Sequence, residues 1–82
     1  MNTIIMALTI EPRNAHAVDV QDVLTKHGCI IKTRLGLHEA DQNMCSQKGL
    51  IILQLHGDIE KVEELKKDLE IIEGVKVNYM VL

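Results

Sequence analysis

The sequence predicts one α+β domain in which strands and helices follow the order β-α-β-β-α-β. Three observations support this prediction. In four short segments apolar residues recur at every second position, which is typical of strands. In two longer segments they recur every three or four positions, which is typical of helices, and glycines or a proline separate the segments. The chain has 82 residues, enough for a single domain that we assign to residues 1–82.

The first strand is expected over residues 3–10, TIIMALTI. Both of its faces are largely apolar, which favours a position in the centre of a sheet. Pro12 cannot donate a backbone hydrogen bond and therefore ends the strand. Asn14 is a favourable N-cap for a helix over about residues 15–27. Gly28 then stands where a left-handed helix cap is common.

The second strand is expected over residues 29–37, CIIKTRLGL, where one charged face indicates an edge strand. We expect Cys29 to lie in the core, on the same face as Ile31 and Leu35, because free cysteine is among the most buried residue types. A polar loop follows. The third strand, over residues 50–55, is again apolar on both faces, which predicts a second central strand.

Gly57 and Asp58 are expected to end the third strand and begin the second helix. The apolar residues of this helix recur at intervals of three and four: Ile59, Val62, Leu65, Leu69 and Ile72. Gly74 ends the helix, and residues 75–82, VKVNYMVL, alternate as a fourth strand.

This order predicts the ferredoxin-like βαββαβ sandwich, a four-stranded antiparallel sheet with both helices on one face. The other face would then expose Ile5, Ala7, Leu50 and Ile52 of the two central strands. At ~25 cal/mol per Å² of apolar area, covering them is worth a few kcal/mol, which predicts a homodimer or homotetramer. The alternative is that these are scattered surface aliphatics, which need no partner.

Composition excludes several classes of protein. Tyr79 is the only aromatic residue, so the core is expected to be aliphatic and base stacking is not available. The formal net charge is −3, and residues 58–73 carry seven carboxylates against three lysines, which argues against nucleic-acid binding. Neither end pairs a basic segment with a long apolar run, and there are two cysteines, so we expect a cytoplasmic protein without a membrane segment.

His38 and Cys45 are metal-ligand types within the expected polar loop. The close spacings typical of zinc sites are missing, and two ligands are too few unless another subunit supplies more. A plain solvated loop is the favoured interpretation, and we expect no cofactor. A catalytic Cys–His pair would need an orienting third group, and no flanking signature supports one, so we do not expect an enzyme.

Lys32, Arg34 and Gly36 form the candidate ligand site. The two cations are two positions apart on one strand face, and Gly36 would allow a close backbone approach. Such a group could hold an anionic ligand or the acidic helix of a neighbouring subunit. The equally weighted alternative is that these charges protect an edge strand from unwanted pairing.

The segments KTRLGL, KGLIILQLHGD and LEIIEGVKVNYMV resemble the iron-only hydrogenase system regulator family. These are short proteins grouped with ACT domains and with the C-terminal regulatory domain of the nickel-responsive repressor. The resemblance implies an ACT-like, ferredoxin-like fold and a non-catalytic, homo-oligomeric module that senses a small ligand or binds a protein partner. It also implies a transcriptional or maturation role linked to iron-only hydrogenase.

Two departures from related families bear on the ligand. The segment IEPRNA after the first strand has no glycine, whereas the matching loop of amino-acid-binding ACT domains does. The expected loop before the third strand holds one His and one Cys, unlike the dense cluster of the nickel repressor. Amino-acid binding and nickel sensing are therefore not carried over, and a metal-handling accessory role through His38 and Cys45 stands as the alternative function.

Overall fold

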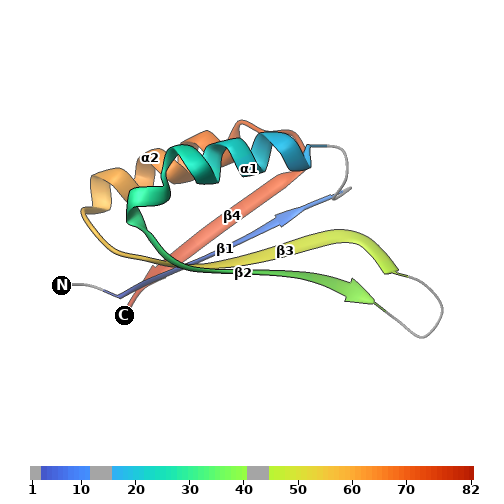
Figure 1. Cartoon of the computed structure of the whole chain (residues 1–82), viewed down its shortest axis with the longest axis horizontal. Coiled ribbons are helices and arrows are strands. Elements are labelled where there is room, and N and C mark those ends of the chain that lie inside the picture. The colour runs from blue at the N-terminus through green and yellow to red at the C-terminus, as the bar shows by residue number, and fades with distance from the viewer. Residues whose placement is uncertain (1–2, 12–15, 41–44) are drawn as a thin grey trace.

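The structure is a computed structural model that describes residues 3–11, 16–40 and 45–82, with side chains described for residues 3–11, 16–36 and 49–82. It confirms the predicted order of elements (Figure 1). These are β1 (Ile4–Ile10), α1 (Ala17–Lys26), β2 (Ile31–Ala40), β3 (Cys45–Leu55), α2 (Ile59–Glu70) and β4 (Val75–Val81), with a 3₁₀ turn, η1 (Gly28–Ile30), before β2.

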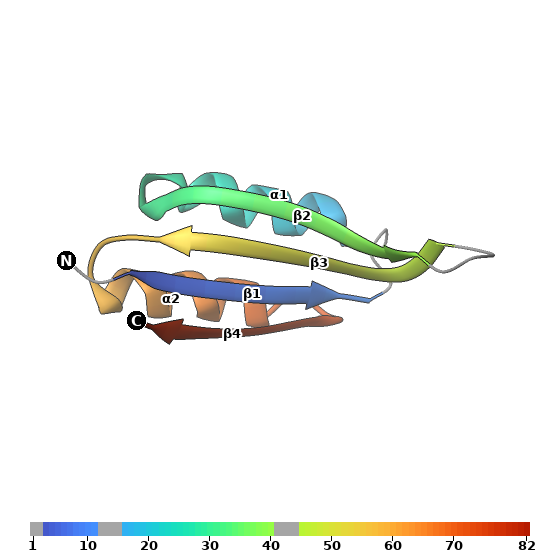
Figure 2. The same ribbon diagram turned by 90° about the horizontal axis from the view of Figure 1, so that it is seen from below.

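The four strands form one antiparallel sheet in the order β2-β3-β1-β4. The two strands that are apolar on both faces, β1 and β3, are central, as predicted. Both helices cover one face of the sheet, and the view from below shows the other face without a helix (Figure 2). This is the ferredoxin-like arrangement expected from the sequence.

The core is an aliphatic layer between the sheet and the helices. Opposed residues of antiparallel strands share a face, so the alternate residues of β1 that face the helices meet matching residues of β3. Among the described residues no charged or polar side chain is buried. The buried residues are Ile4, Met6, Leu8, Ile10, Val20, Leu24, Ile30, Leu53, Leu55, Val62, Leu65 and Leu69.

The first helix ends differently from the prediction. Among the described residues, glycines with positive φ are Gly57 (φ 111°) and Gly74 (φ 84°), so the prediction of a left-handed cap at Gly28 is wrong. The chain instead continues into η1, and the N–H of His27 still bonds to the carbonyl of Val23 at 3.1 Å. The helix N-cap is His16, and Asn14 lies outside the described residues.

This extra turn also changes which residue enters the core. Cys29 is exposed in η1, so the prediction that it is buried is wrong, and its neighbour Ile30 is buried instead. The register with β3 shifts between Ile31 and Thr33, leaving Lys32 as an extra residue. Such a bulge reverses the alternation of faces, so Thr33 and Leu35 lie on the face opposite to Ile31, and Arg34 lies on the same face as Ile31.

The segment expected to be a polar loop is mostly a hairpin. β2 continues to Ala40 and β3 begins at Cys45, with these two residues paired, and residues 41–44 lie outside the described part. β1 ends at Ile10, opposite Gly49 of β3. The paired strands β2 and β3 therefore extend past the end of β1 (Figure 2). The polar composition of this segment predicted a loop. It forms strands because backbone pairing between strands tolerates polar side chains.

Candidate functional site

The helix-free face of the sheet gathers all four residues predicted to form an interface. Ala7 of β1 lies opposite Ile52 of β3, while Ile5 lies opposite Gln54 and Leu50 lies opposite Thr9. Ala7 is exposed, and Ile5, Leu50 and Ile52 are half-buried. We call this surface the open face.

Two further apolar residues, which the sequence did not assign to it, extend the open face. Leu35 of β2 lies opposite Ile52 and is 51% exposed, because the bulge at Lys32 turns it away from the core. Met80 of β4 lies opposite Ile5 and is 54% exposed. A shallow hollow in this region is lined by Ile5, Ala7, Asn78, Tyr79 and Met80. Exposed or half-buried apolar side chains therefore continue across all four strands.

Among the side chains that the structure describes, the polar groups at the ends of the open face are uncharged with one exception. The hydroxyl of Thr33 donates to the side-chain carbonyl of Gln54 at 3.4 Å across β2 and β3. Lys76, opposite Thr9, carries the charge, and no carboxylate occurs at the positions of this face within residues 3–11, 16–36 and 49–82, whose side chains are described. The open face therefore has little electrostatic repulsion against a second copy of itself.

The candidate ligand residues lie along the β2 edge of the sheet. Arg34 lies opposite Leu53 on the helix side, and its guanidinium donates to the side-chain carbonyl of Gln21 on α1. Gly36 lies opposite Ile51 on the same side, and a Cβ added there would meet no atom within 4 Å. Lys32 is exposed at the bulge. This edge thus offers a guanidinium beside open space next to α1.

The candidate metal ligands occupy paired strands near the end of the hairpin. His38 lies opposite Gly49, and Cys45 lies opposite Ala40, while the side chains of His38 and Cys45 lie outside the described part. In the part of the chain that is described, no three His, Cys, Asp or Glu side chains gather closely enough to hold a metal ion.

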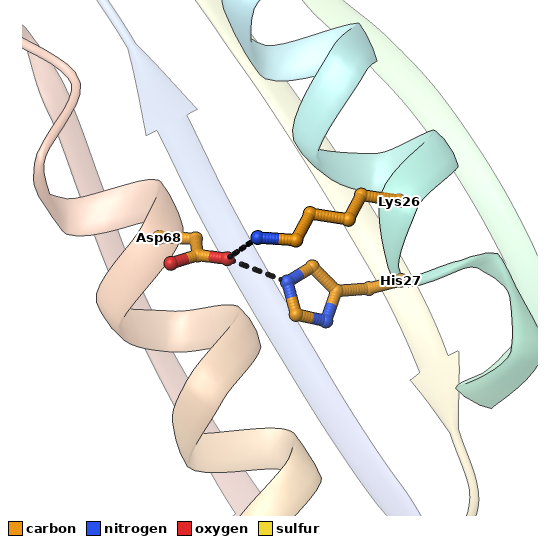
Figure 3. Close-up of polar contacts among 3 residues, drawn as sticks. All are labelled: Lys26, His27 and Asp68. Carbon is orange, nitrogen blue, oxygen red and sulfur yellow. Dashed lines mark hydrogen bonds and ion pairs between the residues drawn. The ribbon is translucent and has the colours of Figure 1, made fainter.

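A polar cluster that the sequence did not reveal joins the two helices (Figure 3). The Oδ2 atom of Asp68 on α2 accepts hydrogen bonds from His27 Nε2 at 2.7 Å and from Lys26 Nζ at 3.3 Å. The pKa of Asp68 lies below its ordinary value. The main cause is the hydrogen bond from His27, and the hydrogen bond from Lys26 lowers the pKa further. The partners are separated by about forty positions, so no local spacing could have indicated this contact.

The single tyrosine joins α2 to β4. The Tyr79 hydroxyl donates to a carboxylate oxygen of Glu63, and this hydrogen bond raises the pKa of Tyr79. The ammonium of Lys66 lies 5.7 Å from the centre of the same ring.

Neither described helix, α1 or α2, has the length and apolar character needed to cross a membrane.

Comparison with known proteins identifies the fold. No family model matches the chain, and no curated protein matches it. Solved structures do match. The uncharacterized protein TM1266 from Thermotoga maritima has 24% identity and a TM-score of 0.82, over 98% of this chain and 95% of that chain.

Two further solved structures match at lower identity. CPII from Thiomonas intermedia K12, a nitrogen regulatory PII-like protein solved with ADP, AMP and bicarbonate, has 18% identity and a TM-score of 0.61 over 100% of this chain and 93% of its own. CutA1 from Pyrococcus horikoshii has 16% identity and a TM-score of 0.56 over 96% and 82%. At such identities the matches establish the ferredoxin-like fold over the whole chain length.

Proposed function

We propose that this chain is a non-catalytic, self-associating regulatory module that senses a small ligand. The observation that carries the proposal is the open face, an apolar sheet surface that neither helix covers. Support also comes from the fold match to a nitrogen regulatory protein solved with nucleotides. The sequence resemblance adds a link to the iron-only hydrogenase system.

The size and character of the open face support self-association. The sheet lies along the 43 Å and 17 Å axes of the molecule (Figure 2). These axes set an upper limit on the area of the open face, and each partner of a standard protein interface contributes about 800 Å². Covering the apolar part stabilises the assembly at about 25 cal/mol per Å², before the cost of ordering is subtracted.

A matched pair of variants tests the assembly. Ile52→Asp places a carboxylate in the middle of the open face, whereas Val18→Asp places one on α1, where the valine is 72% exposed on the opposite side of the molecule. Measured by size exclusion with light scattering, the wild type and Val18→Asp should be oligomers and Ile52→Asp a monomer. An unchanged mass for Ile52→Asp would refute assembly through this face.

The proposed ligand site is the β2 edge, where Lys32, Arg34 and Gly36 lie. A guanidinium binds anionic groups through paired hydrogen bonds, and the space beside Gly36 is open in a single copy. ADP and AMP are suitable first probes because the CPII structure contains them.

Titration calorimetry of the wild type with each nucleotide should show binding that Arg34→Ala weakens by about tenfold, the loss typical of one charge-assisted contact. Lys61→Ala removes an exposed cation of α2 and should leave the affinity unchanged. Absence of heat with both nucleotides would exclude ADP and AMP as ligands. Equal loss of affinity in Lys61→Ala and Arg34→Ala would show that net charge, rather than the β2 edge, binds them.

A further inference from the structure

The outer surface of the helix layer contains a groove between α1 and the C-terminal end of α2. Its volume is about 380 Å³. Three apolar side chains, Val23, Ile71 and Ile72, contribute to its lining. Ile71 is 81% exposed, more than any other large apolar residue described. An isoleucine this exposed beside a partly buried Ile72 leaves apolar surface in water on a face distinct from the open face.

The remaining lining residues make the groove acidic. Asp19 and Asp22 come from α1, and Asp68 comes from α2. The one cation of the lining, Lys26, already contacts Asp68 at 3.3 Å. His16 lies 3.4 Å from Asp19, outside the lining. The aspartates of α1 therefore give the groove a net negative charge at neutral pH.

The surroundings reinforce this charge. Residues 58–73, which include all of α2, carry seven carboxylates and three lysines. The groove also adjoins the C-terminal end of α2, where the helix dipole is negative. A cationic partner would be attracted over a distance comparable with the Debye length, about 8 Å at physiological salt.

We propose that this groove is a docking site for a cationic amphipathic segment of a partner protein. In this arrangement an apolar side chain of the segment covers Ile71 and Ile72, while its lysine or arginine side chains contact Asp19 and Asp22. Charge complementarity selects this occupant. An acidic or phosphate-rich partner would be repelled, and so would the same acidic helix layer of a second copy.

The location makes this interaction independent of assembly. The groove lies on the helix layer, and the open face lies on the other side of the sheet (Figure 1). A module that assembles through one face and presents an acidic groove on the other could bind its partner while assembled. The two interactions can therefore be tested separately.

The test uses the full chain and a fluorescein-labelled peptide of 14 residues, built from leucine and lysine at helical spacing. Binding is followed by fluorescence anisotropy at low salt, and its location by amide chemical shifts of the ¹⁵N-labelled chain. We expect the largest shift changes within residues 19–26 and 68–72. Charge reversal by Asp22→Lys should weaken binding by about tenfold.

The matched control is Glu60→Lys, which makes the same change of net charge on an exposed residue of α2 outside the groove lining. It should weaken binding by less than about twofold, because distant surface charges are screened. Ile71→Ser should weaken binding by about fivefold, since it removes most of one exposed apolar side chain. Circular dichroism verifies that each variant is folded.

Three outcomes would overturn the proposal. Glu60→Lys could weaken binding as much as Asp22→Lys, which would indicate attraction by net charge alone. The shift changes could map to the open face, or Ile71→Ser could have no effect. The Ile52→Asp variant separates this proposal from the assembly, because it should lose self-association and still bind the peptide with the wild-type affinity.

Discussion

The Nε2 atom of His27, in the turn after α1, lies 2.7 Å from Oδ2 of Asp68 on α2 (Figure 3). An ionised carboxylate can only accept hydrogen bonds, so His27 donates through Nε2. The imidazole is only 11% exposed, which limits competition from water. This contact joins the end of α1 to α2 beside the groove.

Acid should weaken this contact in a predictable window of pH. The pKa of Asp68 is lowered from its ordinary value of 3.8, so its ionised form stabilises the folded state. That contribution is complete above pH 3.8 and is lost as the pH falls through the lower pKa of the folded protein. The melting temperature of Asp68→Asn should therefore lie below that of the wild type at pH 6, and the difference should shrink toward pH 2. A difference in melting temperature that does not change with pH would contradict this role. The control is Glu64→Gln, which removes an exposed carboxylate of α2.

Tyr79 provides an optical measure of the contact between α2 and β4. It is the only tyrosine, and there is no tryptophan, so absorbance at 295 nm reports its ionisation alone. The hydrogen bond to Glu63 raises its pKa above 10.0, and the stability linked to it is present below pH 10 and lost as the pH rises through the folded pKa. Glu63→Gln should bring the midpoint back toward 10. Equal midpoints for the wild type and this variant would exclude the contact in solution.

Gly74 should be the glycine least tolerant of substitution. Its φ of 84° disfavours any side chain, and an added Cβ would lie 2.4 Å from the backbone oxygen of Glu11. Gly74→Ala should lower the free energy of unfolding by about 2–4 kcal/mol. Gly28→Ala, where no atom lies within 4 Å and φ is not positive, should change it by less than about 1 kcal/mol. Urea denaturation measures both, and similar losses would contradict the structure at the turn before β4.

Asn78 occupies one outward-facing backbone donor at the exposed edge of β4. The N–H of Leu82 donates to the backbone carbonyl of Thr3 at 2.8 Å. Because successive N–H groups of a strand point to opposite sides, the N–H of Tyr79, three residues earlier, points away from β1. The side-chain oxygen of Asn78 accepts this outward N–H at 2.9 Å, which occupies a donor that another strand could use.

Removing this acceptor should expose the edge. We expect Asn78→Val, made in the Ile52→Asp background, to form species larger than the parent variant at high concentration in light scattering. Asn78→Asp retains an acceptor in the same position and should behave like the parent. Identical masses for the valine and aspartate variants would show that Asn78 does not limit edge pairing.

The sequence predicted the fold because its strongest patterns are the ones that decide the core. Ile4, Met6 and Leu8 alternate without interruption, and they are buried as the alternation requires. The apolar residues of α2 recur at helical spacing, and the central three of them are buried. The four residues predicted to form the open face share one side for the same reason.

The errors lie where local geometry breaks a pattern. An alternation that is continuous in the sequence placed Cys29 and Leu35 on the core side, but η1 and the bulge at Lys32 change the phase twice. Contacts between distant segments, such as His27 with Asp68 and Tyr79 with Glu63, have no signature in sequence spacing. They became visible only once the helices were placed on the sheet.

Sedimentation equilibrium of the wild-type chain over a dilution series tests the central claim, that the open face draws copies of this chain together. We predict a mass of at least twice the 9.2 kDa of one chain at micromolar concentration, and return to a single chain in Ile52→Asp. A wild-type protein that stays at 9.2 kDa throughout the series, folded and soluble, would contradict it.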